Sequence, residues 1–244
     1  MIEPDRKRMG QHAARLAAQT LRTALADRGS ARIIVATGSS QFEVLESLVQ
    51  EPDIAWDRID GFHLDEYVGL APTHPASFCG YLKERFVDRV PLRSFHYLDG
   101  LADPSIVCRS AEQAIRMQPV DLAMIGIGEN GHLAFNDPPA DFEIDAAYHV
   151  VPLDEACRRQ QVGEGWFASL DDVPKLAISM TIRDILRAKR IVCSVPDARK
   201  AEAVRAAIEG PLTNQLPASI LRQHPNATIL LDAASAKLLS RSNS

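Results

Sequence analysis

Residues 120–139 have the sequence VDLAMI-GIGENGH-LAFNDPP, an apolar run followed by a glycine-rich turn and a polar segment. The run at 120–125 predicts a buried strand, because apolar residues dominate it and a glycine ends it. Gly126, Gly128 and Gly131 then allow tight backbone conformations that a Cβ atom would forbid. In open α/β sheets, ligands bind beyond the carboxyl ends of the strands. The segment therefore predicts a strand of such a sheet and one wall of a binding site.

The polar residues of this turn are candidates for proton transfer. His132 closes the turn, Asn130 precedes it, and Asp137 follows a few residues later. A titratable group held at the end of a strand is a candidate acid or base. A surface histidine on a glycine-rich loop is the alternative, because a G-x-G-x-x-G pattern alone has low specificity. The closing histidine and the continuation A-F-N-D-P-P favour the functional interpretation.

The bulk composition is that of a globular domain. The 244 residues suit one α/β domain, and 46% apolar residues are enough for a substantial core. A net charge of -5 does not support binding to nucleic acid or to an anionic membrane as the main task. The N-terminus is polar, and no apolar run approaches the roughly 18 residues of a membrane span. We therefore expect a soluble, cytoplasmic protein.

The cysteines predict no metal site. Four of them are scattered along the chain without a C-x-x-C pair or other metal-ligand spacing: Cys79, Cys108, Cys157 and Cys193. We expect them to be small buried side chains in a reducing compartment.

Strand and helix patterns alternate along the chain. Strands are predicted at 32–36, 58–64, 95–98, 120–125, 147–151, 176–179, 191–195 and 228–231. Helices are predicted at 9–25, 41–49, 77–87, 104–117, 182–188, 199–208 and 233–239. Such alternation, with mostly continuous apolar strands, indicates a parallel sheet covered on both faces. We expect residues 1–244 to form a single α/β domain with a Rossmann-like, open, mostly parallel sheet.

The first predicted strand leads into Thr37, Gly38, Ser39 and Ser40. A turn of this kind before a helix directs backbone N–H groups at an anion, and the helix adds about half a positive charge. The lysine and spacing of a Walker A loop are missing, which favours a smaller phosphate or sugar over a nucleoside triphosphate. An ordinary helix N-cap explains the same residues equally well. Both interpretations stay open on this segment alone.

A carboxylate pair and a lysine complete the candidates. Asp65 and Glu66 stand with Tyr67 at the end of an apolar run, and neighbouring side chains on an extended segment point to opposite sides. At most one carboxylate therefore faces a given site, where it could act as a general base, although a solvated Asp-Glu turn is commoner. Lys200 lies in the first turn of a predicted helix, where it opposes the helix dipole unless an anion shares the site. An exposed lysine is the alternative.

Together these segments resemble the glucosamine-6-phosphate deaminase/isomerase family. The resemblance covers about residues 33–231 in the family's order. Its pieces are TGSS at 37–40, LDEYVGL at 64–70, HPxS at 74–77, GIGxNGHxAFN at 126–136, VPxxAxS at 173–179, KAxAVxxAIEG at 200–210 and PASILRQHPNAT at 217–228. The combination is far more specific than any one piece.

The resemblance implies a role for each matching residue. The substrate phosphate would be held by Thr37, Gly38, Ser39, Ser40 and the cationic Lys200. Asp65 would be the general base that moves a proton between C2 and C1 of the sugar. His132 would open the pyranose ring by transferring a proton to the ring oxygen, with Asn130 orienting it. Asp137 stands where the best-known members have Glu.

These residue types suit the implied reaction. A C–H group next to an imine or carbonyl is weakly acidic, so the reaction needs a positioned carboxylate and stabilisation of an enediol-like intermediate. An imidazole can transfer protons both ways near neutral pH. Ring opening, the proton shift and water attack on the imine would convert glucosamine 6-phosphate to fructose 6-phosphate and ammonia. The reaction requires no metal or organic cofactor, and the sequence offers no evident site for one.

Two departures from the family pattern affect the site. Asp137 is one methylene shorter than Glu, so its contact with His132 or the substrate amine must be remodelled. Residues 153–167 occupy the family's mobile lid region without the phosphate-binding arginine of the allosteric hexameric members at an obvious position. Arg158 or Arg159 is the candidate substitute.

Residues 140–145 are acidic where the allosteric members carry basic effector-binding residues. We therefore predict that an N-acetylated amino-sugar phosphate does not activate this protein. Saturation curves measured with and without that effector should superpose, and a clear shift would contradict the prediction. The acidic segment also leaves the sugar epimer open, galactosamine 6-phosphate included. The oligomeric state stays open too, since family members range from monomers to homo-oligomers.

Two other functions remain alternatives. The related 6-phosphogluconolactonases share the implied fold but resemble D-E-R and G-x-D-G-H-T-A-S-L-F-P where this chain has DEY at 65–67 and GHLAFN at 131–136. Ammonia release, compared with lactone hydrolysis, separates the two. A non-catalytic sugar-phosphate sensor, as in bacterial transcription regulators, would need a DNA-binding module. Residues 1–30 supply little more than one helix, and the chain is acidic.

Overall fold

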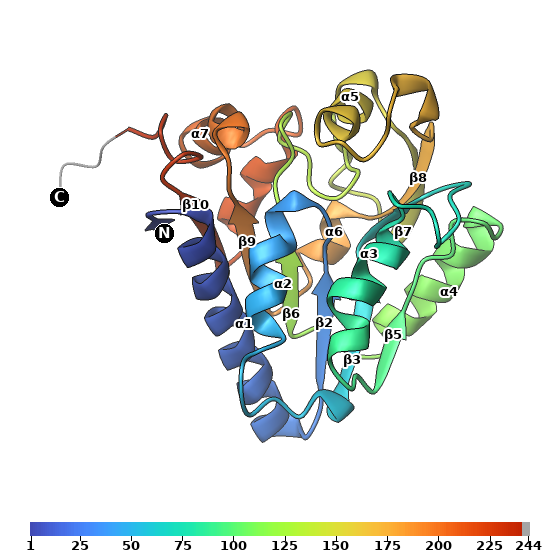
Figure 1. The fold of residues 1–244 in the computed structure, drawn as a ribbon, viewed down its shortest axis with the longest axis vertical. Helices are drawn as coiled ribbons and strands as arrows, with labels where there is room; N and C mark the ends of the chain where they lie inside the picture. The colour runs from blue at the N-terminus through green and yellow to red at the C-terminus, as the bar shows by residue number, and fades with distance from the viewer. Residues whose placement is uncertain (241–244) are drawn as a thin grey trace.

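The main sheet has seven parallel strands. The computed structural model describes residues 1–240 and places these strands in the order β1-β10-β9-β6-β2-β3-β5 (Figure 1). Their bounds are β1 (Ile2–Glu3), β2 (Ala31–Val35), β3 (Ile59–His63), β5 (Ser94–His96), β6 (Leu122–Ile125), β9 (Arg190–Val195) and β10 (Ala227–Asp232). Along the chain, the sheet grows from β2 toward β5 in one direction and from β6 toward β10 in the other. The carboxyl ends of β2 and β6 therefore form a topological switch point, the usual ligand site of such sheets.

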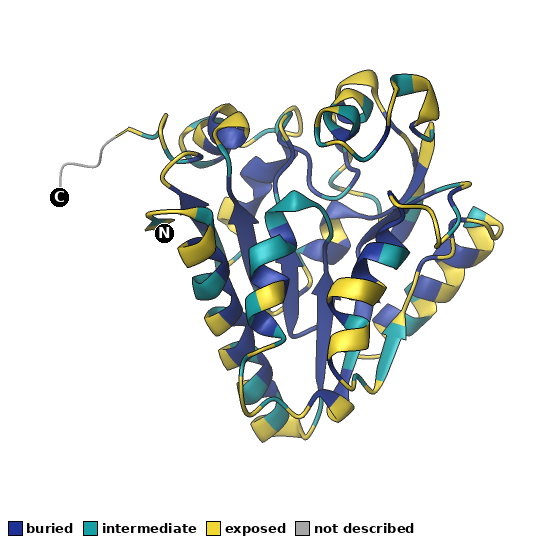
Figure 2. Ribbon diagram, in the orientation of Figure 1, coloured by how far each residue is buried: buried dark blue, intermediate teal, exposed yellow. Residues whose placement is uncertain are grey.

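Helices cover both faces of this sheet, as predicted. One face packs against α1 (Arg6–Arg28), α2 (Phe42–Leu48) and α3 (Phe78–Arg85), and the other against α4 (Pro104–Arg116), α6 (Ile182–Ile185) and α7 (Ala201–Glu209). Because strand side chains alternate, Ile33 and Val35 lie in the first core and Ile34 lies in the second. The central strands are buried along their whole length (Figure 2). The prediction of an α/β fold with a mostly parallel, two-sided sheet is confirmed.

Two predicted strands belong to a different sheet. β4 (Asp65–Tyr67), β8 (Leu176–Met180) and β7 (Tyr148–Pro152) form a separate antiparallel sheet in the order β4-β8-β7. The predicted strand at 58–64 therefore ends early, at His63, and the chain enters β4 after Leu64. Because β4 pairs with β8, Asp65 lies opposite Ser179 beyond the edge of the main sheet.

The sequence pattern missed one helix and wrongly predicted another. Residues 155–163 form α5 (Glu155–Gly163), which the sequence pattern did not predict; its N-cap Asp154 accepts a hydrogen bond from the Cys157 amide. The helix predicted at 233–239 is wrong, since these residues form turns after β10. There the Asp232 carboxylate accepts the Ser235 amide, a local bond that competes with helix hydrogen bonding.

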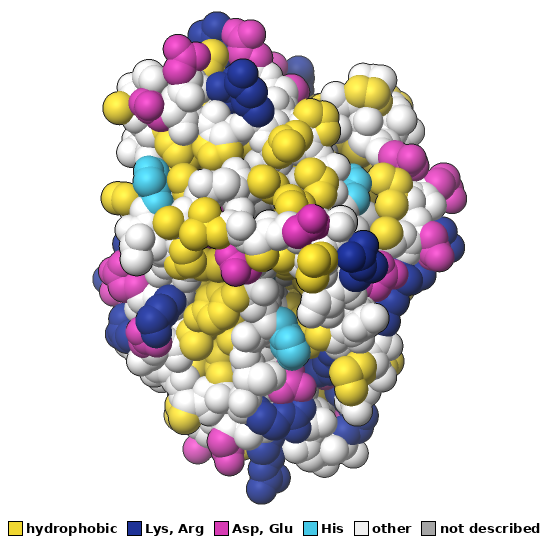
Figure 3. Space-filling model, turned by 90° about the vertical axis from the view of Figure 1, so that its right-hand side faces the viewer, with side chains coloured by type: hydrophobic (Ala, Val, Ile, Leu, Met, Phe, Trp, Pro, Cys, Tyr) yellow, Lys and Arg dark blue, Asp and Glu magenta, His cyan; other side chains and the backbone are white. Residues whose placement is uncertain are grey.

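The described surface carries scattered exposed apolar side chains. Figure 3 shows a face on which apolar side chains lie between scattered charged ones. The exposed large apolar residues include Tyr97, Leu101, Ile106, Val150 and Leu176. Within residues 1–240, none of the helices has the length and apolar character needed to cross a membrane.

Candidate active site

A cavity lies at the carboxyl edge of the sheet, where the loops after β2 and β6 meet β4 and α5. Seven of the residues singled out by sequence line it together: Thr37, Gly38, Ser39, Ser40, Asp65, His132 and Lys200. They come from four segments that are far apart along the chain. Asn130 and Asp137 are absent from the lining but contact His132. The topological switch point thus brings one acid, one imidazole and one lysine to a common cavity.

The turn at 37–40 is held in a single shape. Gly38 has φ +88°, a conformation that favours glycine, and its carbonyl accepts a hydrogen bond of 3.0 Å from the Tyr81 hydroxyl. The Gln41 side chain ties the turn to β6 by donating to the Ile125 carbonyl at 3.2 Å. A Cβ atom on Gly126 would lie 2.7 Å from Ser40 Oγ, so this glycine permits the close approach of the two loops. The turn is thus a fixed rim of hydroxyl groups.

Lys200 is a buried cation beside this rim. It is 5% exposed, and its Nζ lies 3.7 Å from Glu164 Oε1 and 3.9 Å from Glu129 Oε1, beyond hydrogen-bond distance. Burial lowers the pKa of Lys200, while the charges of Glu164 and Glu129 act to raise it. A lysine in this position has donors available for an anion in the cavity.

Asp65 and Glu66 point to different environments. Glu66 caps α3, where it accepts hydrogen bonds from the Ser77 hydroxyl at 2.9 Å and from the Cys79 amide at 2.7 Å. Asp65 faces the cavity, is 6% exposed, and has an Oδ1 atom without a hydrogen-bond partner among the described residues. Burial, together with the neighbouring charge of Glu66, raises the pKa of Asp65 to about 8. A carboxyl group with such a pKa suits proton transfer near neutral pH.

His132 is oriented by the two polar residues predicted around it. Its Nδ1 lies 3.0 Å from Asp137 Oδ1, which also accepts a 2.9 Å hydrogen bond from the Asn130 amide group. The side-chain Oδ1 of Asn130 accepts a hydrogen bond from the His132 backbone amide at 3.1 Å. Burial acts to raise the pKa of Asp137, but the hydrogen bond and charge of His132 outweigh it and hold that pKa below its ordinary value. The shorter Asp137 therefore still reaches the imidazole.

Glycine at position 128 makes room for the imidazole. A Cβ atom there would lie 2.3 Å from His132 Nε2, so any other residue would displace the ring. Gly131 has φ +86°, which turns the chain back toward the ring. Gly128 is therefore the glycine of the turn that gives the imidazole its space.

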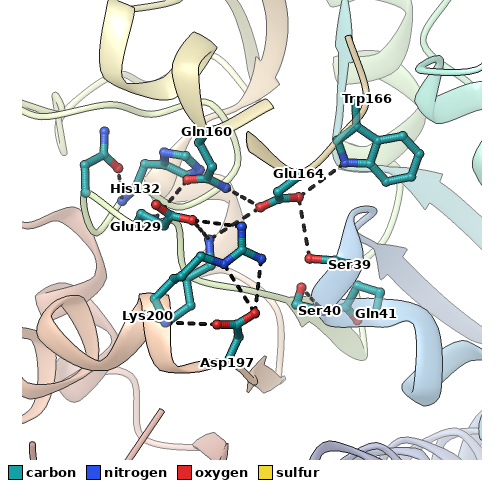
Figure 4. A network of polar contacts seen from close by, with 12 residues as sticks. Ser39, Ser40, Gln41, Glu129, His132, Gln160, Glu164, Trp166, Asp197 and Lys200 are labelled. Atoms are coloured by element: carbon teal, nitrogen blue, oxygen red, sulfur yellow. Dashed lines mark hydrogen bonds and ion pairs between the residues drawn. The ribbon is translucent and has the colours of Figure 1, made fainter. Parts of the chain in front are cut away.

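Helix α5 supplies cavity residues that the sequence pattern missed. Gln160, Gln161 and Glu164 line the cavity, and the polar network around Glu164 reaches Ser39, Trp166 and Lys200 (Figure 4). The i, i+4 spacing of Gln160 and Glu164 was the available signal, because residues four apart share one helix face.

The two candidate lid arginines do not line the cavity. Arg158 donates to the backbone carbonyls of Leu170 and Val173, and so holds the loop that follows α5. Arg159 is exposed and pairs with Glu155 one turn earlier on the same helix. The face of α5 that carries Gln160 and Glu164 meets the cavity instead.

Two side-chain groups among the described residues have the spacing of a metal site. Their donor atoms lie within 4.8 Å of one another, and the groups are His63 with Glu66 and Cys79, and His132 with Asp137 and Cys157. Glu66 already accepts several hydrogen bonds, and the second group contains the His132–Asp137 pair. A reaction without metal or cofactor stays a prediction.

Known proteins are similar to this chain over most of its length. The family model for glucosamine-6-phosphate isomerases/6-phosphogluconolactonase matches residues 4–230. Glucosamine-6-phosphate deaminases of Lactobacillus delbrueckii subsp. bulgaricus and Oenococcus oeni are 37% and 38% identical, covering 87% and 85% of this chain and 89% and 86% of theirs. That of Exiguobacterium sibiricum is 40% identical, over 84% of this chain and 80% of its own.

Solved structures agree on the fold. A monomeric glucosamine-6-phosphate deaminase superposes with a TM-score of 0.89 at 33% identity, covering 98% of both chains. A 6-phosphogluconolactonase from Shewanella baltica superposes with a TM-score of 0.79 at 18% identity, covering 95% of this chain and 96% of that one. The second likeness concerns the fold alone.

Proposed function

This chain belongs to the glucosamine-6-phosphate isomerase/6-phosphogluconolactonase family, and we propose on that premise that it isomerises and deaminates a 6-phosphorylated amino sugar. With glucosamine 6-phosphate, the products are fructose 6-phosphate and ammonia. The observation that carries the proposal is the convergence of Asp65, His132 and Lys200 on one cavity with the turn at 37–40. Relatives named as deaminases match over most of both chains, which favours deamination over lactone hydrolysis.

The phosphate group binds at the rim between the turn and Lys200. The hydroxyls of Thr37, Ser39 and Ser40 donate hydrogen bonds to its oxygens, and the Lys200 ammonium balances its charge. Because Lys200 is buried, water screens this attraction weakly. The anchored phosphate leaves the sugar ring to extend toward Asp65 and His132.

His132 catalyses ring opening. With Nδ1–H donating to Asp137, Nε2 is the nitrogen available to exchange a proton with the ring oxygen. The carboxylate of Asp137 fixes the imidazole orientation, and Asn130 fixes the carboxylate in turn. Asp137 and Asn130 thus position His132 without contacting the substrate themselves.

The proton shift falls to Asp65. Its carboxylate removes the proton from C2 of the open-chain amino aldehyde and returns it to C1. A proton passes from the C2 amino group to O1, so that the C=O bond at C1 is replaced by a C=N bond at C2. Water then adds to the C2 imine, and ammonia leaves. The raised pKa makes Asp65 a stronger base than a solvated aspartate once it is ionised.

A substrate screen tests the proposal. The protein is incubated with glucosamine 6-phosphate, galactosamine 6-phosphate and 6-phosphogluconolactone, and both ammonia and lactone hydrolysis are measured. We expect ammonia from an amino-sugar phosphate and no more lactone hydrolysis than in buffer. Lactone hydrolysis without ammonia release would overturn the proposal, and binding without any turnover would favour a sensor. The same screen shows whether the substrate is the gluco or the galacto epimer. A cytoplasmic location stays a prediction.

A further inference from the structure

The Glu164 carboxylate lies at the anion end of the cavity. Its side chain is 6% exposed, with Oε1 3.7 Å from Lys200 Nζ and Oε2 3.5 Å from Ser39 Oγ (Figure 4). These two groups are the ones that the proposed function assigns to the substrate phosphate. A phosphate within hydrogen-bond distance of both would meet the carboxylate, so the two anions cannot share this position.

Neighbouring donors hold the carboxylate in this place. Gln160 Nε2 donates to Glu164 Oε1 at 2.9 Å, and Trp166 Nε1 donates to Oε2 at 3.2 Å. Gly165 has φ +82°, which reverses the chain after α5. The Trp166 ring then packs against Tyr81, with 6.2 Å between the ring centroids. Gln160 in turn accepts the Glu129 amide at 3.0 Å, which links α5 to the histidine turn. The contact is therefore part of an ordered network.

The local charge balance also opposes a phosphate. Lys200 faces two carboxylates, those of Glu164 and Glu129. Two other cations lie nearby and are already paired. Arg199 pairs with Asp197 at 3.1 Å and approaches Glu129 at 3.6 Å, and Arg6, which donates to the Ser39 carbonyl, pairs with Glu43 at 2.7 Å. A phosphate dianion beside a buried carboxylate is strongly repelled, because little water separates the charges. Removing Glu164 from this position leaves Lys200 available to the phosphate.

We propose that Glu164 is an autoinhibitory residue of the anion subsite, whose carboxylate competes with the substrate phosphate for Ser39 and Lys200. A sugar phosphate then binds only when the end of α5 withdraws this carboxylate. The inference rests on the proposed function for the location of the phosphate. Because the Trp166 indole donates to the same carboxylate, phosphate binding changes the surroundings of that indole.

Inorganic phosphate is a suitable probe, because it requires no turnover. Its affinity is measured by calorimetry for the full chain and for Glu164→Gln, Glu164→Ala and Glu155→Gln. Glu155 is the matched control, since it lies on the same helix but is exposed and paired with Arg159. We expect both Glu164 variants to bind phosphate about tenfold more tightly than the unaltered chain, and Glu155→Gln to bind like it. Equal or weaker binding by both Glu164 variants, or no binding by any chain, would overturn the inference.

Fluorescence reports the predicted movement. Phosphate should shift the tryptophan emission of the unaltered chain, and Trp166→Phe should abolish the shift although Trp56 remains. An emission that phosphate leaves unchanged in the unaltered chain would count against withdrawal of Glu164.

Steady-state kinetics separate this inference from the proposed function. With the amino-sugar phosphate, Glu164→Gln should lower KM, whereas a fall in kcat at constant KM would instead identify Glu164 as a catalytic group and overturn the inference. The unaltered chain could release no ammonia while Glu164→Gln still binds phosphate more tightly. That result would contradict the proposed function and support this inference.

Discussion

Asp65→Asn is expected to lower kcat for ammonia release by about 10²- to 10⁴-fold, the usual contribution of a positioned general base. Asparagine has almost the same shape as aspartate, but its amide cannot take the C2 proton. The proposed phosphate subsite lies on other segments, so inorganic phosphate should bind to the variant as it binds to the unaltered chain. Full turnover by Asp65→Asn would show that the base is a different residue.

The pH dependence of the unaltered enzyme provides a second check on the same residue. Burial and the charge of Glu66 raise the pKa of Asp65 to about 8, and only the ionised carboxylate is a base. Below that pKa, kcat/KM should fall about tenfold for each pH unit, since it follows the ionised fraction of the free enzyme. A profile of kcat/KM that is flat from about pH 6 to pH 9 would contradict this assignment.

Asp65→Asn should also raise the free energy of unfolding. Aspartate in the unfolded chain ionises near its ordinary pKa of 3.8, whereas Asp65 in the folded chain has a pKa of about 8, so unfolding releases a proton between these values. The stability contributed by the protonated group is fully present below the lower pKa and is lost as pH rises toward the upper one. The asparagine side chain cannot ionise, so the variant should gain on the order of 5 kcal/mol over the unaltered chain near pH 8 and little near pH 4. Denaturant unfolding at both pH values measures the difference.

The parallel sheet was predictable because its strands are strong local signals. The runs at 120–125 and 191–195 correspond to β6 and β9 within two residues, since continuous apolar segments bounded by polar turns favour buried strands. The partners of a strand are a different matter. The sequence predicts strands at 147–151 and 176–179, but the antiparallel pairing of these two strands with each other, and of the second with β4, depends on tertiary contacts that no local pattern encodes.

Part of the candidate site was likewise predictable from local sequence, and part depends on tertiary contacts. Residues at strand ends were identified from sequence, because polar residues and glycines after an apolar run are conspicuous. The contribution of α5 was missed, because only Cys157 and Gln161 of this helix are buried and its apolar periodicity is weak. Glu164 is polar, and only its contacts with the distant Ser39 and Lys200 make it a cavity residue. Helix geometry also explains why Arg159 does not line the cavity, since it pairs with Glu155 on another face of α5.

His132→Gln should lower kcat/KM for the ring-closed sugar phosphate by about 10²- to 10³-fold, because the ring oxygen loses its proton donor. Glutamine keeps polar atoms near the ring position but does not exchange protons near neutral pH. Inorganic phosphate binding should be unaltered, since the turn at 37–40 and Lys200 do not contact the imidazole through any hydrogen bond of the described residues. Asp137→Asn is the matched variant. It keeps the side-chain size but removes the charge that orients the ring, so a smaller loss is expected.

An isotope effect can show which step His132 serves. In the unaltered enzyme, deuterium at C2 should slow turnover, because Asp65 breaks that C–H bond. When ring opening becomes the slow step in His132→Gln, C–H cleavage no longer limits the rate, and the effect of deuterium should shrink toward unity. A variant that keeps the full isotope effect would place His132 in the proton shift rather than in ring opening. A variant with an undiminished rate would remove it from the reaction, and the turn held by Gly128 and Gly131 would then need another explanation.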